Sequence, residues 1–158
     1  MSLLGFFQWC EQSGIGDTIR RSSWLFPMIE AIHLLGLGVI GGSVLTVDLR
    51  LLGLGLRRQS TAQLARDAQP WLIGSLLLMV MTGSLLFLSE AVKCYYHEAF
   101  WFKMTSLFLA IVFTFTIQRK VILADETRLR PVWSKVVAVV SILLWSGVGI
   151  GGRWIGFS

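Results

Sequence analysis

Residues 71–88, WLIGSLLLMVMTGSLLFL, contain no charged side chain. As an α-helix, a stretch of this length would rise about 27 Å, which is close to the thickness of the hydrocarbon core of a bilayer. A helix on the surface of a soluble protein would instead show a polar face at every turn. The stretch therefore predicts a helix that crosses a membrane.

Similar apolar stretches occur elsewhere, so that the expected spans cover residues 24–47, 71–92, 100–117 and 136–154. Hydrophobic residues make up 54% of the chain and charged residues only 15%. This composition predicts an all-α, polytopic membrane protein whose four helices run up and down in a lipid bilayer as one domain, residues 1–158. The net charge of +5 comes from basic residues in short loops, a pattern that excludes nucleic acid as a partner.

The apolar part of residues 1–20 is too short to span a bilayer. This segment is instead predicted to form an amphipathic helix that lies in the membrane interface. Its apolar side chains should face the headgroup region: Leu3, Phe6, Phe7 and Trp9. Its polar side chains Gln8, Glu11 and Gln12 should face water.

Lysine and arginine are distributed unevenly between the two sides of the predicted bundle. Nine lie in the loops after the first and third spans: Arg50, Arg57, Arg58, Arg66, Arg119, Lys120, Arg128, Arg130 and Lys135. Five lie toward the other side: Arg20, Arg21, Lys93, Lys103 and Arg153. Because basic loops tend to remain cytoplasmic, both termini are expected on the outer side, which is the periplasm for a bacterial inner-membrane protein.

Ionisable side chains within a bilayer are costly, and each therefore needs a partner or a function. Glu30 and His33 are spaced i,i+3 and share one face of the first span. His33 comes nine residues after Trp24, which places it about 13 Å from the outer surface and close to the midplane. By depth, Lys103, Arg153 and His97 belong to the same outer half.

One imidazole near the midplane with basic groups nearer the surface is the arrangement that holds a b-type haem: the imidazole ligates iron and the basic groups pair with the propionates. The predicted cofactor residues are His33, which is the metal ligand, Glu30, Lys103, Arg153 and His97. Such a protein would serve electron transfer or haem-linked redox chemistry with a redox partner or a quinone.

Several questions about this site stay open at the sequence level. The second axial ligand is His97, one of the methionines Met79, Met81 and Met104, a group from another subunit, or none. His33 could instead hydrogen-bond only to protein, and the two basic residues could extend to the outer surface.

The glycines near His33 and Arg153 either leave room for a flat macrocycle or allow helices to pack closely. Packing between helices, or between the subunits of a homo-oligomer, typically uses the spacing seen in Gly38-x-x-x-Gly42 and Gly147-x-x-x-Gly151. The alternative functions are a membrane protein that handles copper or another small solute, and a structural subunit without a cofactor.

Cys10 and Cys94 are both expected on the oxidising side, where they could pair or remain free thiols. No hydrolase or phosphoryl-transfer motif is present, and no catalytic residue is assigned.

Three motifs carry a family resemblance: MIEAIHLLGLGVIGGSVLTVDLRLLGL at residues 28–54, FWFKMTSL at 100–107 and SILLWSGVGIGGRWIGF at 141–157. They resemble a group of bacterial four-helix membrane proteins that includes the HemJ-type protoporphyrinogen oxidases and the CopD-type copper-resistance domains. The chain is most similar to an uncharacterised family within that group. The resemblance implies a b-type haem on His33, a site role for Lys103 and, in the enzyme members, haem-dependent oxidoreductase activity.

Overall fold

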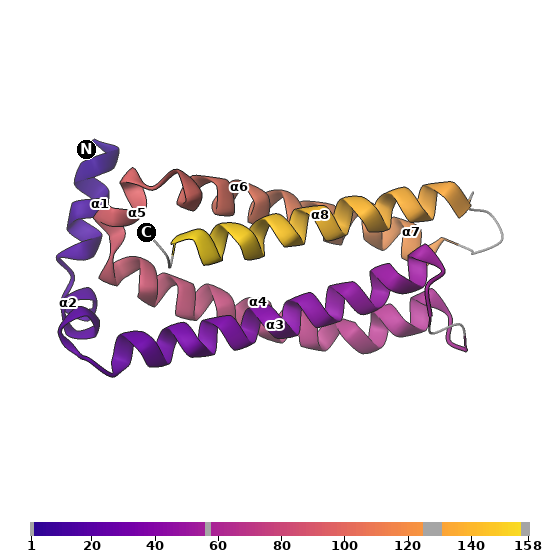
Figure 1. Cartoon of the computed structure of the whole chain (residues 1–158), viewed down its shortest axis with the longest axis horizontal. Helices are drawn as coiled ribbons and strands as arrows, with labels where there is room; N and C mark the ends of the chain where they lie inside the picture. The colour runs from indigo at the N-terminus through magenta and orange to yellow at the C-terminus, as the bar shows by residue number, and fades with distance from the viewer. Residues whose placement is uncertain (1, 56–57, 125–130, 156–158) are drawn as a thin grey trace.

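The computed structural model describes residues 2–55, 58–124 and 131–155, which are mostly helical with no strand among them. Arg57, Arg128 and Arg130 of the basic loops lie outside the described residues. Four long helical segments run side by side (Figure 1). They are α3 (Leu25–Leu52), α4 (Thr61–Ser89), α6 (Glu98–Phe113), which continues through the π-helix η1 (Thr114–Gln118) into α7 (Arg119–Leu123), and α8 (Pro131–Ile155). Each is long and apolar enough to cross a membrane, which confirms the predicted up-and-down bundle.

Most ends of the long helices lie beyond the predicted spans, whereas α4 ends at Ser89, before the predicted end at residue 92. Local caps set the end of α3 and the beginning of α4. Helix α3 ends at Leu52 because the next residue, Gly53, has a φ of 80° that only glycine adopts readily. Leu54 N–H then donates to Leu49 O, as in a Schellman motif. Helix α4 begins at Thr61, well before residue 71, because Ser60 Oγ accepts a hydrogen bond from Gln63 N–H. The polar segment before residue 71 therefore belongs to the helix.

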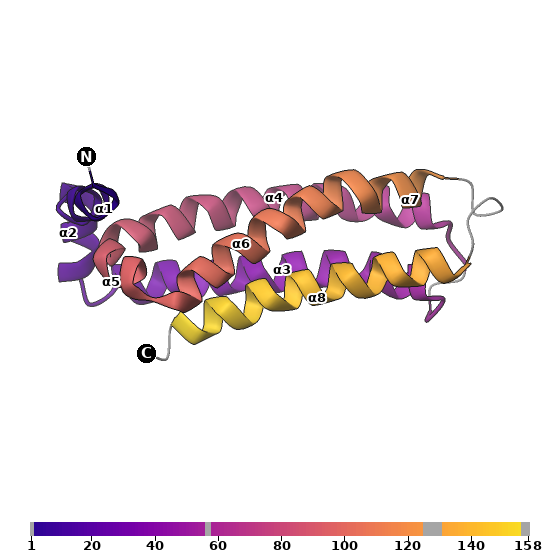
Figure 2. The same cartoon turned by 90° about the horizontal axis from the view of Figure 1, so that it is seen from above.

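The four helices form two layers, α3 with α4 and α6 with α8, and α3 also packs against α8 (Figures 1 and 2). Helices α4 and α6 approach each other less closely along most of their length. The buried core lies where the layers meet: Ile40, Val44, Met79, Ala110, Trp145 and Val148.

The outward faces of all four long segments are apolar. Leu35 is 70% exposed, Leu77 61%, Phe108 67% and Leu143 66%. In water, an apolar surface covering every side of a bundle would be unfavourable, whereas lipid solvates it. The described chain is that of a multi-pass membrane protein.

Helices α1 (Leu3–Glu11) and α2 (Gly14–Arg21) lie across one end of the bundle together with α5 (Ala91–Tyr96), and we call this end the α1 end (Figure 1). The N-terminal segment thus contains two helices, because Ser13 caps a new one. Leu3, Phe6 and Trp9 are exposed, as an interfacial helix requires. Phe7 differs from the expectation, since it is buried against Ala91 and Phe87 within the protein.

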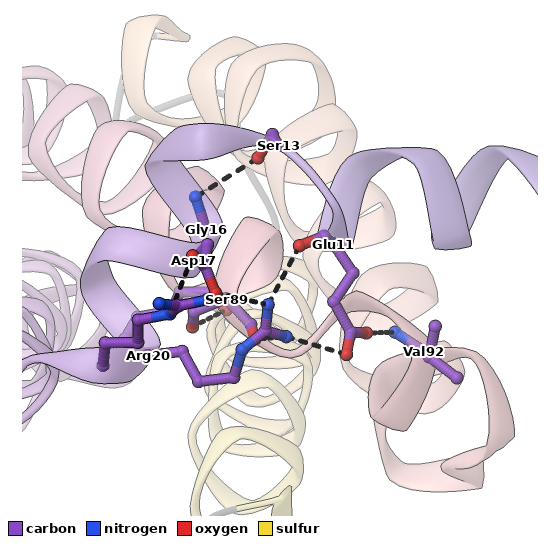
Figure 3. Close-up of polar contacts among 9 residues, drawn as sticks. Glu11, Ser13, Gly16, Asp17, Arg20, Ser89 and Val92 are labelled. Atoms are coloured by element: carbon purple, nitrogen blue, oxygen red, sulfur yellow. Dashed lines mark hydrogen bonds and ion pairs between the residues drawn. The ribbon is translucent and has the colours of Figure 1, made fainter.

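Glu11 also differs from the expectation that it faces water. Its carboxylate accepts a hydrogen bond from Val92 N–H of α5 at 2.6 Å and pairs with the Arg20 guanidinium of α2 at 2.9 Å. Arg20 also donates to Ser89 O at the end of α4, at 3.3 Å. These contacts join four elements at the α1 end (Figure 3).

Candidate functional site

The candidate site is centred on His33, a buried histidine of α3. His33 Nδ1 lies 2.8 Å from Thr82 Oγ1 of α4, and the Thr82 hydroxyl lies 2.7 Å from Leu78 O. A hydroxyl carries one hydrogen, and a carbonyl oxygen can only accept, so Thr82 donates to Leu78. His33 Nδ1–H must then donate to Thr82 Oγ1, an arrangement that in a neutral ring leaves the lone pair on Nε2.

His33 Nε2 is buried and has no hydrogen-bond partner among the described residues. Leaving a buried acceptor without a partner costs about 1–3 kcal/mol. A histidine that binds a metal has this same division of roles, in which one ring nitrogen donates to a protein oxygen and the other offers its lone pair. Nε2 is therefore free to accept a ligand.

Gly83 leaves the space that the imidazole occupies. A Cβ at Gly83 would stand 3.1 Å from His33 Cε1, which is closer than side chains normally approach. Two consecutive residues of α4 thus fix the ring: Thr82 holds Nδ1, and Gly83 lets the ring lie against the helix backbone.

Two cavities meet at His33. The smaller, of about 230 Å³, has a polar wall toward the α1 end: Glu30, Glu90, Lys93, Cys94 and Lys103. The larger, of about 460 Å³, lies in the open seam between α4 and α6 and has apolar and aromatic walls that include Phe87, Phe100, Trp101 and Trp145. His33 and Lys103 line both cavities, which makes them two lobes of one site.

Lys103 reaches the site past two glycines of α8. A Cβ at Gly151 would stand 3.2 Å from Lys103 Cβ, and one at Gly152 would stand 3.5 Å from Lys103 Nζ. These glycines allow α6 and α8 to approach closely while the lysine stem passes between them. The polar lobe therefore contains a lysine side chain, which apolar packing alone would not place there.

A family model matches residues 6–158, nearly the whole chain, and its description is family of unknown function, DUF6644. The chain belongs to the DUF6644 family. No match was found among curated proteins or among solved structures.

The structure brings together three of the five residues that the sequence of this DUF6644 protein singled out. Glu30, His33 and Lys103 line the polar lobe. Arg153 does not line either lobe; it is exposed and lies beside Gly149 and Trp154 on another face of α8. His97 lies at the junction of α5 and α6 and lines neither lobe.

Among the methionines, Met79 lines both lobes and Met104 lines the larger one, whereas Met81 is 68% exposed. Within the described part of the chain, no group of three histidine, cysteine, aspartate or glutamate side chains could hold a metal ion. Among the described residues, the candidate site thus offers one imidazole and no cluster of ligands.

The glycines of this DUF6644 chain that the sequence singled out include some that face a neighbouring helix and some that face outward. Gly147, like Gly151, packs against α6, because its Cβ would stand 3.2 Å from Ser106 Oγ. Gly36 packs against Met79 in the same way. Gly38 and Gly42 have nothing within 4 Å and face outward from the bundle. Helix packing therefore explains the inward-facing glycines named here, and Gly83, which the sequence did not single out, is the one beside the imidazole.

Cys10 and Cys94 are both free and buried. Cys10 belongs to the apolar cluster around Phe7, whereas Cys94 lines the polar lobe. Burial and the nearby Glu90 carboxylate raise the pKa of the Cys94 thiol to about 11. The thiol is therefore neutral at physiological pH and is a poor nucleophile there.

A second polar cluster lies in the protein interior. Gln118 Nε2 donates to Asp48 Oδ1 at 2.7 Å, and Ser141 of α8, like Asp48, is fully buried. The sequence pattern did not single out Gln118 or Ser141. The π-helical turn at Thr114–Gln118 affects which side chains face this cluster, because its extra residue per turn shifts the following side chains around the helix.

Proposed function

We propose that this protein is an integral membrane b-type haem protein in which His33 Nε2 binds the iron. The observation that carries the proposal is the buried, unpartnered Nε2 beside two cavities. A b-type haem supplies a one-electron iron couple, so the protein would serve electron transfer or haem-linked redox chemistry. The resemblance to HemJ-type proteins expected from residues 28–54 would assign the iron to the same histidine.

The walls of the two lobes suit a flat, mostly apolar ligand with an anionic edge. The larger lobe is within the usual range of ligand sites, about 300–1,000 Å³, and is lined by aromatic rings. Lys103, in both lobes, would pair with a propionate. A porphyrin brings its own four nitrogen ligands and needs only one or two from the protein, whereas a copper ion would need several. The single imidazole at this site therefore favours haem over copper.

The chain's own residues would orient the imidazole and keep water from it. Thr82 fixes the ring through Nδ1, and Phe87 and Phe100 cover the lobes on the side of α1. Met79 and Met104 are the candidates for a second axial ligand because they line the larger lobe. A redox partner soluble in lipid, such as a quinone, could approach through the seam between α4 and α6.

The arrangement in the membrane is part of the proposal. The excess of basic residues near the opposite end of the bundle, where α7 and the turn between α3 and α4 lie, favours an inner-membrane protein with both termini and the His33 site toward the periplasm. Gly38 and Gly42 form an open small-residue face on α3, and this face favours assembly with another copy of the chain.

An absorption spectrum tests the proposal. Protein purified in mild detergent from haem-replete cells should show a Soret band that shifts on reduction, and haem added to haem-free protein should saturate at one per chain. A colourless preparation that also fails to take up added haem would contradict the proposal.

The Thr82 hydroxyl is a positioning group in this proposal. Thr82→Val keeps the shape of the side chain but removes the acceptor of His33 Nδ1–H, and we expect haem affinity to fall about 10- to 100-fold. The iron midpoint potential should shift as well, because the hydrogen bond tunes the ligand. Thr82→Ser retains the hydroxyl and should restore both values. Equal affinity in the valine and serine variants would remove Thr82 from the account.

A further inference from the structure

A third cavity lies far from His33, at the end of the bundle that carries α7, which we call the α7 end. It has a volume of about 300 Å³ and lies between α3, α4 and the η1–α7 segment. Its walls are mostly apolar and include Val44, Val47, Leu72 and Ile122. We call this space the α7 groove.

Two arginines from different helices line the α7 groove. Arg66 belongs to α4 and Arg119 begins α7, and both side chains are exposed. Within the described part of the chain neither guanidinium has an ion pair or a hydrogen bond. Two arginines near the start of the chain, in contrast, do form ion pairs: Arg20 pairs with Glu11, and Arg21 pairs with Asp17.

The depth of the groove matches the boundary between headgroups and acyl chains. Arg119 lies near the end of the apolar segment Glu98–Leu123, and Arg66 lies in the first turns of α4, before the uncharged stretch 71–88. Basic pockets between membrane helices at this depth attract anionic lipid headgroups. Guanidinium groups suit phosphate because each can donate two parallel hydrogen bonds.

We propose that the α7 groove binds an anionic phospholipid, whose phosphate lies between Arg66 and Arg119 and whose acyl chain lies along Val47, Leu72 and Ile122. The charge of the two unpaired arginines selects the anionic headgroup, and the apolar wall selects an amphiphile over a free anion. The site is independent of haem on His33, so either proposal can fail without the other.

Thermal unfolding of the purified full-length protein tests the lipid site. In a neutral detergent, phosphatidylglycerol at about 100 times its Kd should raise the Tm by about 5 °C or more, and phosphatidylcholine should not. The double variant Arg66→Gln/Arg119→Gln should lose this stabilisation. Lys120→Gln is the matched control, because Lys120 neighbours Arg119 and is exposed but does not line the groove.

Any of three results of the unfolding experiment would overturn the proposal. Phosphatidylglycerol could stabilise the double variant as much as the wild type, Lys120→Gln could lose as much as the double variant, or inorganic phosphate could stabilise the protein as well as the lipid does. If the double variant does not fold, each single variant should lose part of the effect. Native mass spectrometry of the wild type should also detect retained phosphatidylglycerol, and its absence there would count equally against the site.

Discussion

Replacing Gly16 with alanine should separate α2 from α4 and lower the free energy of unfolding by about 3 kcal/mol. A Cβ at Gly16 would stand 2.2 Å from Leu88 O and 2.9 Å from Leu88 C, and both of these are backbone atoms that cannot turn aside. Helix α2 would have to move, which would strain the contacts of Arg20 with Glu11 and Ser89 (Figure 3).

Gly14→Ala is the matched control for this prediction. Gly14 lies in the same helix, but its Cβ would meet nothing within 4 Å. Alanine there should leave stability unchanged or raise it by a few tenths of a kcal/mol, because it restricts the unfolded chain. Unfolding of both variants by heat and by a denaturing detergent gives the comparison. If Gly16→Ala proved as stable as Gly14→Ala, the packing of α2 on α4 would be wrong.

His33→Ala should abolish haem binding, whereas His97→Ala should retain it. The chain has only these two histidines, and the structure places one beside both lobes and the other beside neither. The absorption spectra of the two purified variants, recorded at equal protein concentration, make the comparison. Pigment retained by His33→Ala, or lost equally from both variants, would contradict the assignment.

A variant that fails to fold could imitate the loss of a ligand. His33→Gly with added imidazole addresses this, because free imidazole can enter the space of the missing ring and supply a nitrogen to the iron. We expect the Soret band to return as imidazole is added, and the band of His97→Gly to be unaffected. Helical content measured by circular dichroism should be the same in all variants.

The bundle could be predicted from the sequence because long uncharged runs have few alternatives in a bilayer. The helix ends were missed because the spans were placed by hydropathy, which does not contain the local hydrogen bond at Ser60 or the backbone angle at Gly53. The role of Glu11 was also beyond a sequence pattern. Its carboxylate meets Val92, which is 81 residues away in the chain.

The sequence predicted the depth of the candidate site in the membrane but not which face of each helix lines it. Lys103 and Arg153 belong to the same level of the membrane, yet only Lys103 lines the cavities at His33. Depth follows from residue number and helix rise, whereas the face depends on how each helix is rotated in the bundle. Thr82 had a weak sequence signal, since it and Ser84 are the two hydroxyls of the uncharged run closest in depth to His33, but its hydrogen bond required the packing of α3 on α4.

The most direct test of the central claim is a hyperfine measurement on one labelled residue. In His97→Gln, protein grown with ¹⁵N-histidine carries the label at His33 alone. Pulsed electron paramagnetic resonance of the ferric haem protein should then detect a ¹⁵N nucleus strongly coupled to the iron, which would identify His33 as the ligand. A pigmented sample in which the labelled nitrogen shows no coupling to the iron would contradict the account.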